Sequence, residues 1–168
     1  DYYTGTVYET MLSGHESMGS VSSGGRYDSL ASDGKHTYPG VGISLGLTRL
    51  LAPMIGKGSI AASRSVPSAV LVAVNTEDDR EISQHIARQL RSRGVPCEVA
   101  PKADKFGKQI RYADRRSIPF VWFPGSVHDG VRGDDEVKDI RSGEQVVARA
   151  DSWNPPAADL WPTVVGTW

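Results

Sequence analysis

Residues 38–54 read YPGVGISLGLTRLLAPM, and the predicted fold of the first part of the chain is built around them. The apolar, glycine-rich run at 41–45 predicts a strand that leads through Gly46 into a helix. The helix is predicted because apolar residues recur at helical spacing, namely Leu47, Leu50, Leu51 and Met54. Arg49 lies off this stripe, in the first turn. Glycine lets a planar ligand approach the backbone closely, and a guanidinium binds phosphate oxygens in bidentate fashion. Gly46 and Arg49 together therefore indicate a binding site for a planar, phosphate-bearing ligand. The alternative is an ordinary strand–turn–helix with an exposed arginine.

The composition describes a globular protein without a strong overall charge. The 168 residues are 39% hydrophobic and 23% charged, with a formal net charge of −1, and they suffice for one or two domains. Any nucleic acid would therefore have to bind a local basic patch. The single cysteine, Cys97, excludes an intrachain disulfide and argues against a cysteine-built zinc site, so we expect no metal. Without a signal peptide or an apolar run of about 18 residues, we expect no membrane partner and a cytoplasmic location.

The segment before residue 38 predicts two strands and a glycine turn. Residues 4–11 are rich in β-branched and aromatic side chains and predict one strand, while 18–22 predict a second, weaker one. The run SSGGRYDSL at 22–30 contains two adjacent glycines, which indicate either a tight turn or a backbone that another group approaches closely, and its Asp28 is placed to cap a short helix. Residues 31–39 read as a polar loop.

A linker is predicted at 57–67, where the sequence KGSIAASRSVP is small, polar and ends in proline. After it, continuous apolar runs predict buried strands at 68–75, 96–100 and 118–123. The two stretches between these strands have helical periodicity. The resulting β-α-β-α-β order predicts right-handed crossovers and a mainly parallel sheet core.

The second of these helices is predicted at 104–116, with Phe106, Ile110 and Ala113 facing inward. A turn sequence, RSGE, predicts a closing antiparallel hairpin between the segments 133–140 and 144–148. The tail at 152–168 contains three prolines and three tryptophans. It cannot form a long helix, and we expect it to pack its tryptophans on the surface.

Three motifs in the first part resemble, in order, the histidyl-tRNA synthetase family of class II aminoacyl-tRNA synthetases. YYTGTVYE at 2–9 resembles the end of the family's histidine-specific motif, SGGRYD at 23–28 its glycine-rich loop, and PGVGISLGLTRL at 39–50 motif 3. In the second part, KQIRYADRRSIPFVWFPG at 108–125 and VKDIRSGEQV at 137–146 are similar to the class IIa anticodon-binding domain.

The resemblance implies an α/β fold with two parts joined by the linker. Residues 1–56 would be the C-terminal part of a class II catalytic domain, with a partial antiparallel sheet and the motif 3 helix. Residues 68–168 would be an anticodon-binding domain with a tail, built on a mixed, mainly parallel five-stranded sheet. The chain starts at Asp1, within the motif, so we expect a C-terminal fragment of a longer protein.

The resemblance also assigns roles to single residues. It implies histidine binding by Tyr2, Tyr3, Gly25 and Tyr27, with Gly24 and Arg26 in the same loop. It implies that Gly46 lies under the adenine of ATP and that Arg49 binds ATP and acts in catalysis, stabilising charge that builds on the phosphoryl oxygens. Thr48 departs from the glutamate that often precedes this arginine in the family.

The predicted partners follow from the same resemblance: histidine tRNA, histidine, and ATP with magnesium as substrate, in a parent histidine–tRNA ligase that forms a homodimer. The arginine of the histidine motif, motif 1 and motif 2 would lie before Asp1. We therefore expect an incomplete active site, no tightly bound cofactor and no adenylation by this chain alone.

A basic run on the predicted helix at 104–116 is the candidate tRNA surface, through Lys105, Lys108, Arg111 and Arg115. A solvated helix face is the alternative for such a charge run. Two other functions stay open for the whole chain. One is a non-catalytic RNA-binding or regulatory module derived from the family, and the other is a generic α/β ligand-binding domain.

Overall fold

The computed structural model describes residues 2–166, apart from the side chain of His128. By their internal contacts these residues form two compact units. Unit 1 comprises the chain up to Ala61 together with Gly166, and unit 2 comprises Ala62–Val165. Each unit is described by itself. Among residues 2–166, no helix is both long enough and apolar enough to cross a membrane.

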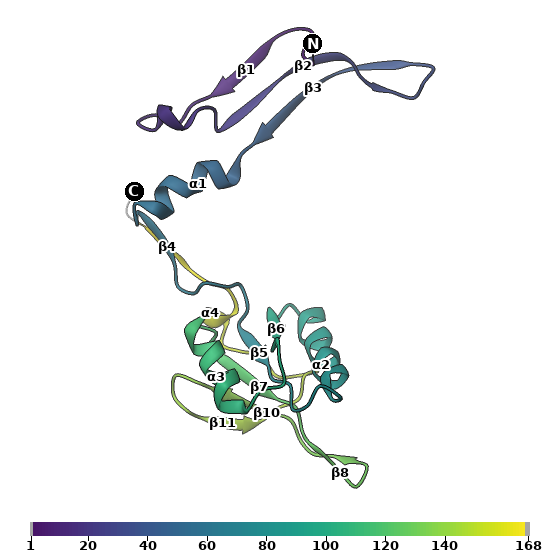
Figure 1. Cartoon of the computed structure of the whole chain (residues 1–168), viewed down its shortest axis with the longest axis vertical. Coiled ribbons are helices and arrows are strands. Elements are labelled where there is room, and N and C mark those ends of the chain that lie inside the picture. The colour runs from purple at the N-terminus through teal and green to yellow at the C-terminus, as the bar shows by residue number, and fades with distance from the viewer. Residues whose placement is uncertain (1, 167–168) are drawn as a thin grey trace. The chain divides into compact units, whose positions relative to one another are not determined.

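Unit 1 is a three-stranded antiparallel sheet followed by a helix (Figure 1). Its sheet order is β1 (Val7–Thr10), β2 (Ser22–Ser32) and β3 (Thr37–Leu45), with a short 3-10 helix, η1 (Glu16–Met18), between the first two strands. The helix α1 (Leu47–Gly56) begins directly after Gly46, as the apolar stripe predicts.

The tight turn at 22–30 is wrong, because these residues form most of β2, but the alternative of a closely approached backbone is confirmed at Gly24. The strand expected at 18–22 begins only at Ser22, as β2. The loop expected at 31–39 is shorter, because β2 continues to Ser32 and β3 begins at Thr37. Asp28 caps no helix. Its carboxylate instead accepts hydrogen bonds from Arg26 Nε at 2.9 Å and from Thr4 Oγ1 at 2.8 Å.

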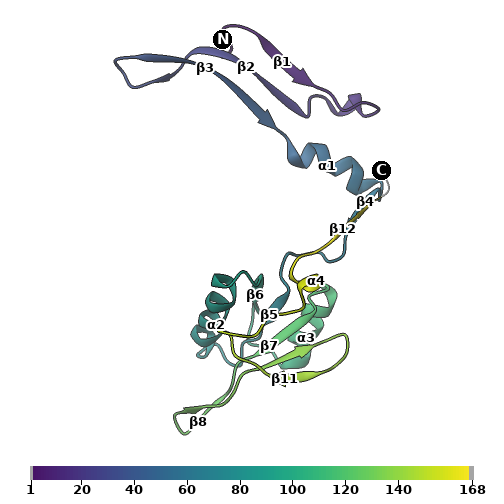
Figure 2. The ribbon, with the colours of Figure 1, turned by 180° about the vertical axis from the view of Figure 1, so that it is seen from behind.

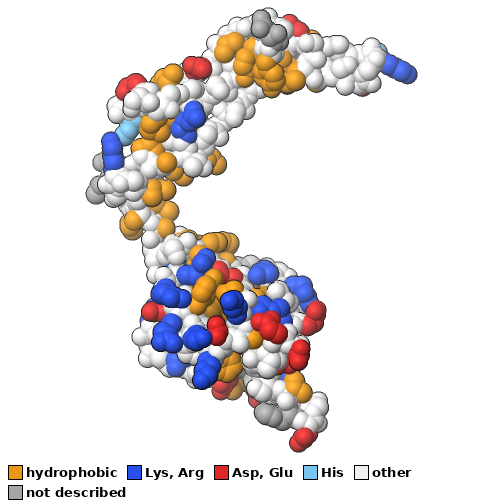
Figure 3. All heavy atoms as spheres, viewed as in Figure 1, with side chains coloured by type: hydrophobic (Ala, Val, Ile, Leu, Met, Phe, Trp, Pro, Cys, Tyr) orange, Lys and Arg blue, Asp and Glu red, His pale blue; other side chains and the backbone are white. Residues whose placement is uncertain are grey.

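Unit 1 buries little apolar surface. Val21 and Ile60 are buried, but Ile43 on β3 is 72% exposed and Leu47 at the start of α1 is 62% exposed. Figure 3 shows hydrophobic side chains on the surface of this part of the chain. Unit 2 contains nearly all of the buried apolar residues. Because burial of apolar area is the main force that stabilises a fold, most of this stabilisation lies in unit 2.

Unit 2 is built on a mixed five-stranded sheet in the order β11-β10-β7-β5-β6, which confirms the predicted sheet. Its strands are β5 (Val70–Val72), β6 (Cys97–Val99), β7 (Phe120–Phe123), β10 (Glu136–Asp139) and β11 (Gln145–Val147). The central β5 is parallel to both β6 and β7, while β10 is antiparallel to β7 and to β11. The predicted closing hairpin is therefore confirmed.

Two apolar clusters fill unit 2, one on each face of the sheet, because successive side chains of β5 point to opposite faces. Val70 and Val72 pack with Ile86 and Leu90 of α2 (Arg80–Ser92). Leu71, between them, packs in the other cluster, with residues of α3 (Phe106–Arg115). The continuous apolar run in the sequence is thus explained by burial on both faces.

The helix at 104–116 is confirmed as α3, but only part of its predicted inward face is buried. Ala113 is fully buried, whereas Phe106 is 42% exposed. Phe106 has the phase of the buried side but lies in the first turn, where its ring contacts Phe123, the last residue of β7. Beyond Phe123 no further residue of β7 is present to cover it.

The segment predicted as a linker contains β4 (Ile60–Ala62), which pairs with β12 (Val164–Gly166) (Figure 2). The tail forms only a short helix, α4 (Ala157–Leu160), before that strand. Trp153 does not lie on the surface as expected but packs edge to face on Phe120 and Trp122. Trp161 is 59% exposed, and residues 167–168 lie outside the described part.

A small hairpin that was not among the predicted elements follows β7. Its strands are β8 (Val127–His128) and β9 (Val131–Arg132). The two turn residues, Asp129 and Gly130, have φ of 51° and 78°. Positive φ at both central positions is typical of a two-residue hairpin turn built from Asp-Gly.

Candidate functional site

Glycines in the sheet of unit 1 make room for tyrosine rings. A Cβ atom on Gly25 would lie 2.8 Å from Tyr3 Cδ1, and one on Gly40 would lie 2.7 Å from the hydroxyl of Tyr27. Tyr27 lies two residues after Gly25 on β2, so the two residues share one face of the sheet. The structure therefore brings Tyr3, Gly25 and Tyr27 together on one face.

Tyr2 joins this group through its neighbour. The rings of Tyr2 and Tyr3 meet edge to face with their centroids 4.8 Å apart. Both residues precede β1, so the alternation of a strand does not separate them. Arg26 does not join the group, because it follows Gly25 and points to the opposite face, where it pairs with Asp28. Hydrogen bonds from Thr4 and then from Arg26 hold the pKa of Asp28 below its ordinary value.

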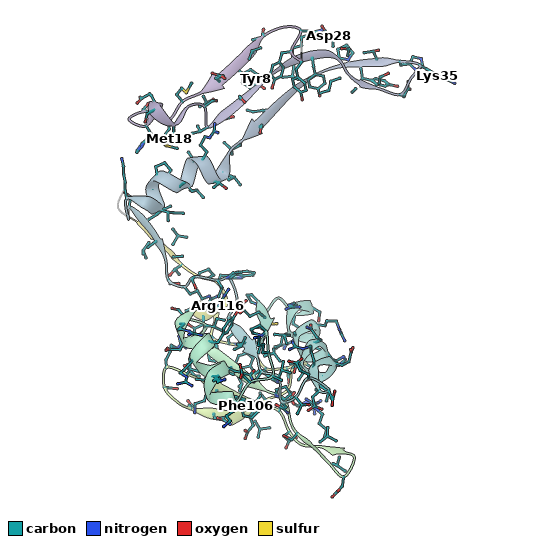
Figure 4. All side chains as sticks on the ribbon, in the orientation of Figure 1. Tyr8, Met18, Asp28, Lys35, Phe106 and Arg116 are labelled. Atoms are coloured by element: carbon teal, nitrogen blue, oxygen red, sulfur yellow. The ribbon has the colours of Figure 1, made fainter. Side chains whose placement is uncertain are left out.

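On the opposite face of the sheet, Tyr8 of β1, labelled in Figure 4, packs against glycines of the two other strands. The hydroxyl of Tyr8 donates to the carbonyl of Gly42 at 2.6 Å. A Cβ on Gly24 would lie 2.1 Å from the same carbonyl oxygen and 2.5 Å from the Tyr8 hydroxyl. Gly24 is thus required for packing inside the sheet rather than for a turn.

Gly46 and Arg49 lie at the junction of β3 and α1. Gly46 is the residue that precedes α1, and its N–H donates to Val21 O at 2.8 Å. Arg49 is exposed and its Nη1 donates to Ser20 O at 2.8 Å. An open hollow of about 540 Å³ is lined by both residues and by backbone and serine groups of 20–23 and 44–48.

The hollow beside Arg49 and the tyrosine face occupy different stretches of the same two strands. Ser22 pairs with Leu45, and Gly25 pairs with Gly42 three residues further along. At about 3.4 Å per residue in an antiparallel strand, the two groups lie roughly 10 Å apart along β2. One cation and hydrogen-bonding serines characterise the first group, and aromatic rings characterise the second.

In unit 2, the four predicted basic residues of α3 are all exposed. They fall on one side of the helix, since three and four residues separate them, and they are Lys105, Lys108, Arg111 and Arg115. Figure 3 shows lysine and arginine side chains gathered over unit 2. Lys108 is paired with Asp104 at 3.0 Å, an exposed ion pair. Within the described residues, no carboxylate forms an ion pair with the other three.

One basic residue of the face, Lys105, opposes the dipole of α3, whereas Arg115 in the last turn complements it. The first turn of α3 contains no acidic residue, and Lys105 stands at its N-cap without a capping side-chain hydrogen bond. A cation near a helix N-terminus costs about 0.3–1 kcal/mol. A charge placed at such a cost indicates a use outside the fold.

A hollow of about 540 Å³ lies along α3 and includes Lys102, Lys108, Arg111 and Arg115 in its lining. Its floor is rigid because the buried Gln109 is fixed by three hydrogen bonds to backbone groups of Val74 and Asp104. Beside it, Arg80 holds Glu77 through two hydrogen bonds, of 2.6 and 2.9 Å. Arg80, with a backbone N–H of Ala103, lowers the pKa of Glu77 to about 2. This ion pair orders the chain next to the basic face.

Periodicity missed one exposed group at the start of α3. The rings of Phe106 and Phe123 meet edge to face, with centroids 5.0 Å apart and planes at 71°. Figure 4 shows Phe106 and Arg116 at opposite ends of the helix. The sequence signal that could have identified the exposed Phe106 is the length of the helical pattern. The first turn of this helix extends beyond the end of the neighbouring strand, so the strand does not cover it.

Metal ligands do not gather in the described part of the chain. Among residues 2–166, with the side chain of His128 left aside, no group of three or more histidine, cysteine, aspartate or glutamate side chains could hold a metal ion.

Comparisons with known proteins match this geometry. The model of the family described as "Anticodon binding domain" matches residues 68–152. The histidine–tRNA ligase of Cutibacterium acnes is 75% identical over 168 residues, which are 100% of this chain and 37% of that protein. That of Micrococcus luteus is 58% identical over 98% of this chain and 36% of its own length.

A solved structure, the histidyl-tRNA synthetase from Nostoc sp. PCC 7120, superposes with a TM-score of 0.50 and 38% identity over 89% of this chain and 35% of that one. The chain therefore spans little more than a third of the length of the relatives it matches. The resemblance to histidyl-tRNA synthetases drawn from the motifs is confirmed. The chain belongs to the anticodon binding domain family, in the form found in histidine–tRNA ligases.

Proposed function

We propose that unit 2 binds the anticodon region of histidine tRNA and that the exposed basic face of α3 contacts the RNA phosphates. The family match at 68–152 carries this proposal. The charge arrangement supports it, because a chain with a net charge of −1 can attract RNA only through a local patch. The residues that supply the patch are Lys105, Lys108, Arg111 and Arg115.

Unit 1 would contribute part of a site for histidine and ATP, in a cytoplasmic, homodimeric histidine–tRNA ligase. The ring faces of Tyr3 and Tyr27 beside Gly25 fit a flat imidazole, with Tyr2 held against Tyr3. The exposed guanidinium of Arg49 and the serine hydroxyls of the hollow fit phosphate oxygens. No carboxylate lines that hollow, so magnesium would arrive on the phosphates of ATP.

The adenylation step needs more cations than this group supplies, since charge builds on several phosphoryl oxygens at once. Arg49 is the only lysine or arginine in the lining of the hollow. We therefore propose that the chain alone binds RNA and does not form histidyl-adenylate. Histidine-dependent pyrophosphate exchange by the purified chain would refute this part of the proposal.

A filter-binding titration with histidine tRNA over a salt series tests the RNA-binding part. Each phosphate contact contributes a slope of about −0.7 in log K against log salt for a single strand, and about −0.9 for duplex DNA. Changing Arg111 or Arg115 to Gln should weaken binding and make the slope shallower by about one contact. Arg88→Gln on α2 is the matched control, because Arg88 is also exposed and lies outside the basic face.

The choice of tRNA separates two outcomes of that titration. Tighter binding of histidine tRNA than of unrelated tRNAs supports anticodon recognition. Equal affinity for all tRNAs, with the same salt slope, would leave only non-specific phosphate binding and would contradict the proposal.

A further inference from the structure

We infer that Phe106 stacks against an unpaired RNA base at the N-terminal end of the basic face of α3. The inference rests on the proposed function of unit 2 and adds the residue that contacts a base. It starts from the observation that Phe106, predicted to face inward, is 42% exposed.

The ring of Phe106 is held in one orientation. Phe123 packs against it edge to face, with the centroids 5.0 Å apart and the planes at 71°. Phe123 itself is half-buried at the end of a strand whose preceding residue, Trp122, is fully buried. An aromatic ring fixed by a rigid neighbour binds a planar partner at a low cost in conformational entropy.

The charges beside the ring select the partner. Phe106 follows Lys105 directly, and the exposed Lys108 lies two residues further on. A nucleotide presents a flat apolar base together with a phosphate, and it therefore matches both the exposed ring and the row of cations beside it. Proteins recognise unpaired RNA by such stacking on aromatic side chains.

The neighbouring basic residues then bind the strand on either side of the stacked base. Lys105 and Lys108 stand on the exposed side of α3, and Arg111 and Arg115 continue the row toward the C-terminal end of the helix. A strand that follows this row reaches Phe106 at its end. Stacking has no base preference of its own, so Phe106 would contribute affinity for an open loop rather than for one sequence.

Three variants of the full chain test the inference, with a stem–loop RNA that carries the anticodon loop of histidine tRNA as the probe. Phe106→Ala should weaken binding about 5- to 100-fold, the loss expected for one stacked base. Phe106→Leu keeps an apolar side chain without a π face and should lose most of the same affinity. Phe106→Trp should restore binding, and its added fluorescence should be quenched by the RNA.

Two controls make the test specific. Trp161→Ala removes an aromatic residue that is 59% exposed and lies outside the basic face, so it should leave binding unchanged. A fully paired RNA of the same length should bind wild type and Phe106→Ala equally, because it offers no free base. The salt slope should not change in the Phe106 variants, since the ring contacts no phosphate.

The outcomes separate this inference from the proposed function. Wild-type affinity in Phe106→Ala or in Phe106→Leu, with affinity lost in Arg111→Gln, would overturn stacking and leave phosphate binding in place. Wild-type affinity in all of these variants would overturn both. An equal loss of affinity for the loop and for the paired RNA would also overturn stacking.

Discussion

The side chain of Gln109 pairs with the backbone of Val74 as a neighbouring strand would. Gln109 Oε1 accepts from Val74 N–H at 3.0 Å, and Gln109 Nε2 donates to Val74 C=O at 2.9 Å. Both residues are buried, with exposures of 3% and 0%. The amide therefore satisfies two backbone groups that lie just past the end of β5 and ties α3 to the sheet.

Gln109→Leu should destabilise unit 2 by about 2–6 kcal/mol, because two buried backbone groups lose their partners at about 1–3 kcal/mol each. Gln109→Glu keeps the acceptor for Val74 N–H and should cost less at low pH, where the carboxyl group can also donate. Urea unfolding followed by tryptophan fluorescence measures both. Gln145→Leu is the control, since Gln145 is exposed and bonds only to Glu136. Equal midpoints for Gln109→Leu and wild type would contradict the pairing.

Replacement of Arg64 by lysine should destabilise unit 2, although Arg64 lies in the segment whose sequence resembles a linker. Its side chain donates to the carbonyls of Val66, Pro67, Asp159 and Leu160, at distances from 2.7 to 3.2 Å. A lysine has one ammonium group and cannot reach four acceptors in this fork. Arg64→Lys should lower the stability of unit 2 by about 2–3 kcal/mol and should make the tail after Trp153 sensitive to proteases.

Arg88→Lys provides the comparison for Arg64, because Arg88 makes one exposed contact, to Glu81 at 3.4 Å. It should change the urea midpoint by no more than the small effect usual at surface positions, within about 0.5 kcal/mol. If Arg64→Lys behaves like Arg88→Lys, the four carbonyl bonds do not stabilise the tail.

Local patterns predict the helices and the core strands, and, apart from the β8–β9 hairpin with its local Asp-Gly turn, the missed features depend on partners distant in sequence. The run at 68–75 identifies β5 because a strand buried on both faces must be apolar throughout. SSGGRYDSL is compatible with a tight turn and with a closely approached backbone, since adjacent glycines mark both. Here Gly24 is needed because Tyr8 and Gly42, from two other strands, leave no room for a Cβ. No local pattern contains that information.

The candidate site shows the same division. The motif residues Tyr3, Gly25 and Tyr27 could be proposed from sequence through their resemblance to a family, and the fold places them on one face. The sequence places Arg64 in a polar linker, because two of its four acceptors, the carbonyls of Asp159 and Leu160, lie 95 and 96 residues away along the chain. Phe106 had the correct helical phase, but the phase does not show where the sheet beneath a helix ends.

Two glycines of unit 2 should respond to alanine in opposite directions. A Cβ on Gly125 would lie 2.0 Å from Gly133 O, and the N–H of Gly125 donates to Asp135, which also accepts from the buried Trp122. Gly125→Ala should therefore destabilise unit 2 by about 1–3 kcal/mol or more. Gly107 lies in α3 with no atom within 4 Å of an added Cβ, so Gly107→Ala should stabilise by about 0.5–1 kcal/mol. Thermal unfolding of both variants measures the signs, and a shared sign would contradict the geometry.

Cys97 should react with thiol reagents only when unit 2 opens. The thiol is 7% exposed, packs beside α2 and contacts Ala87 O at 3.4 Å. Burial raises its pKa to about 11, so the reactive thiolate is scarce at pH 8. Labelling with a disulfide reagent at that pH should be slow in buffer and fast in urea. Rapid and complete labelling of the native chain would contradict the burial.

The raised pKa of Cys97 also predicts how stability depends on pH. An unfolded thiol loses its proton near pH 8.5, whereas the folded thiol keeps it up to about pH 11. Between these values the unfolded state binds fewer protons than the folded state, so the free energy of unfolding falls as the pH rises. The contribution of the thiol is complete below about pH 8.5 and disappears as the pH passes through the folded value. Urea unfolding of wild type and Cys97→Ala across this window should show a steeper fall in wild type, and parallel curves would show that the thiol does not titrate differently on folding.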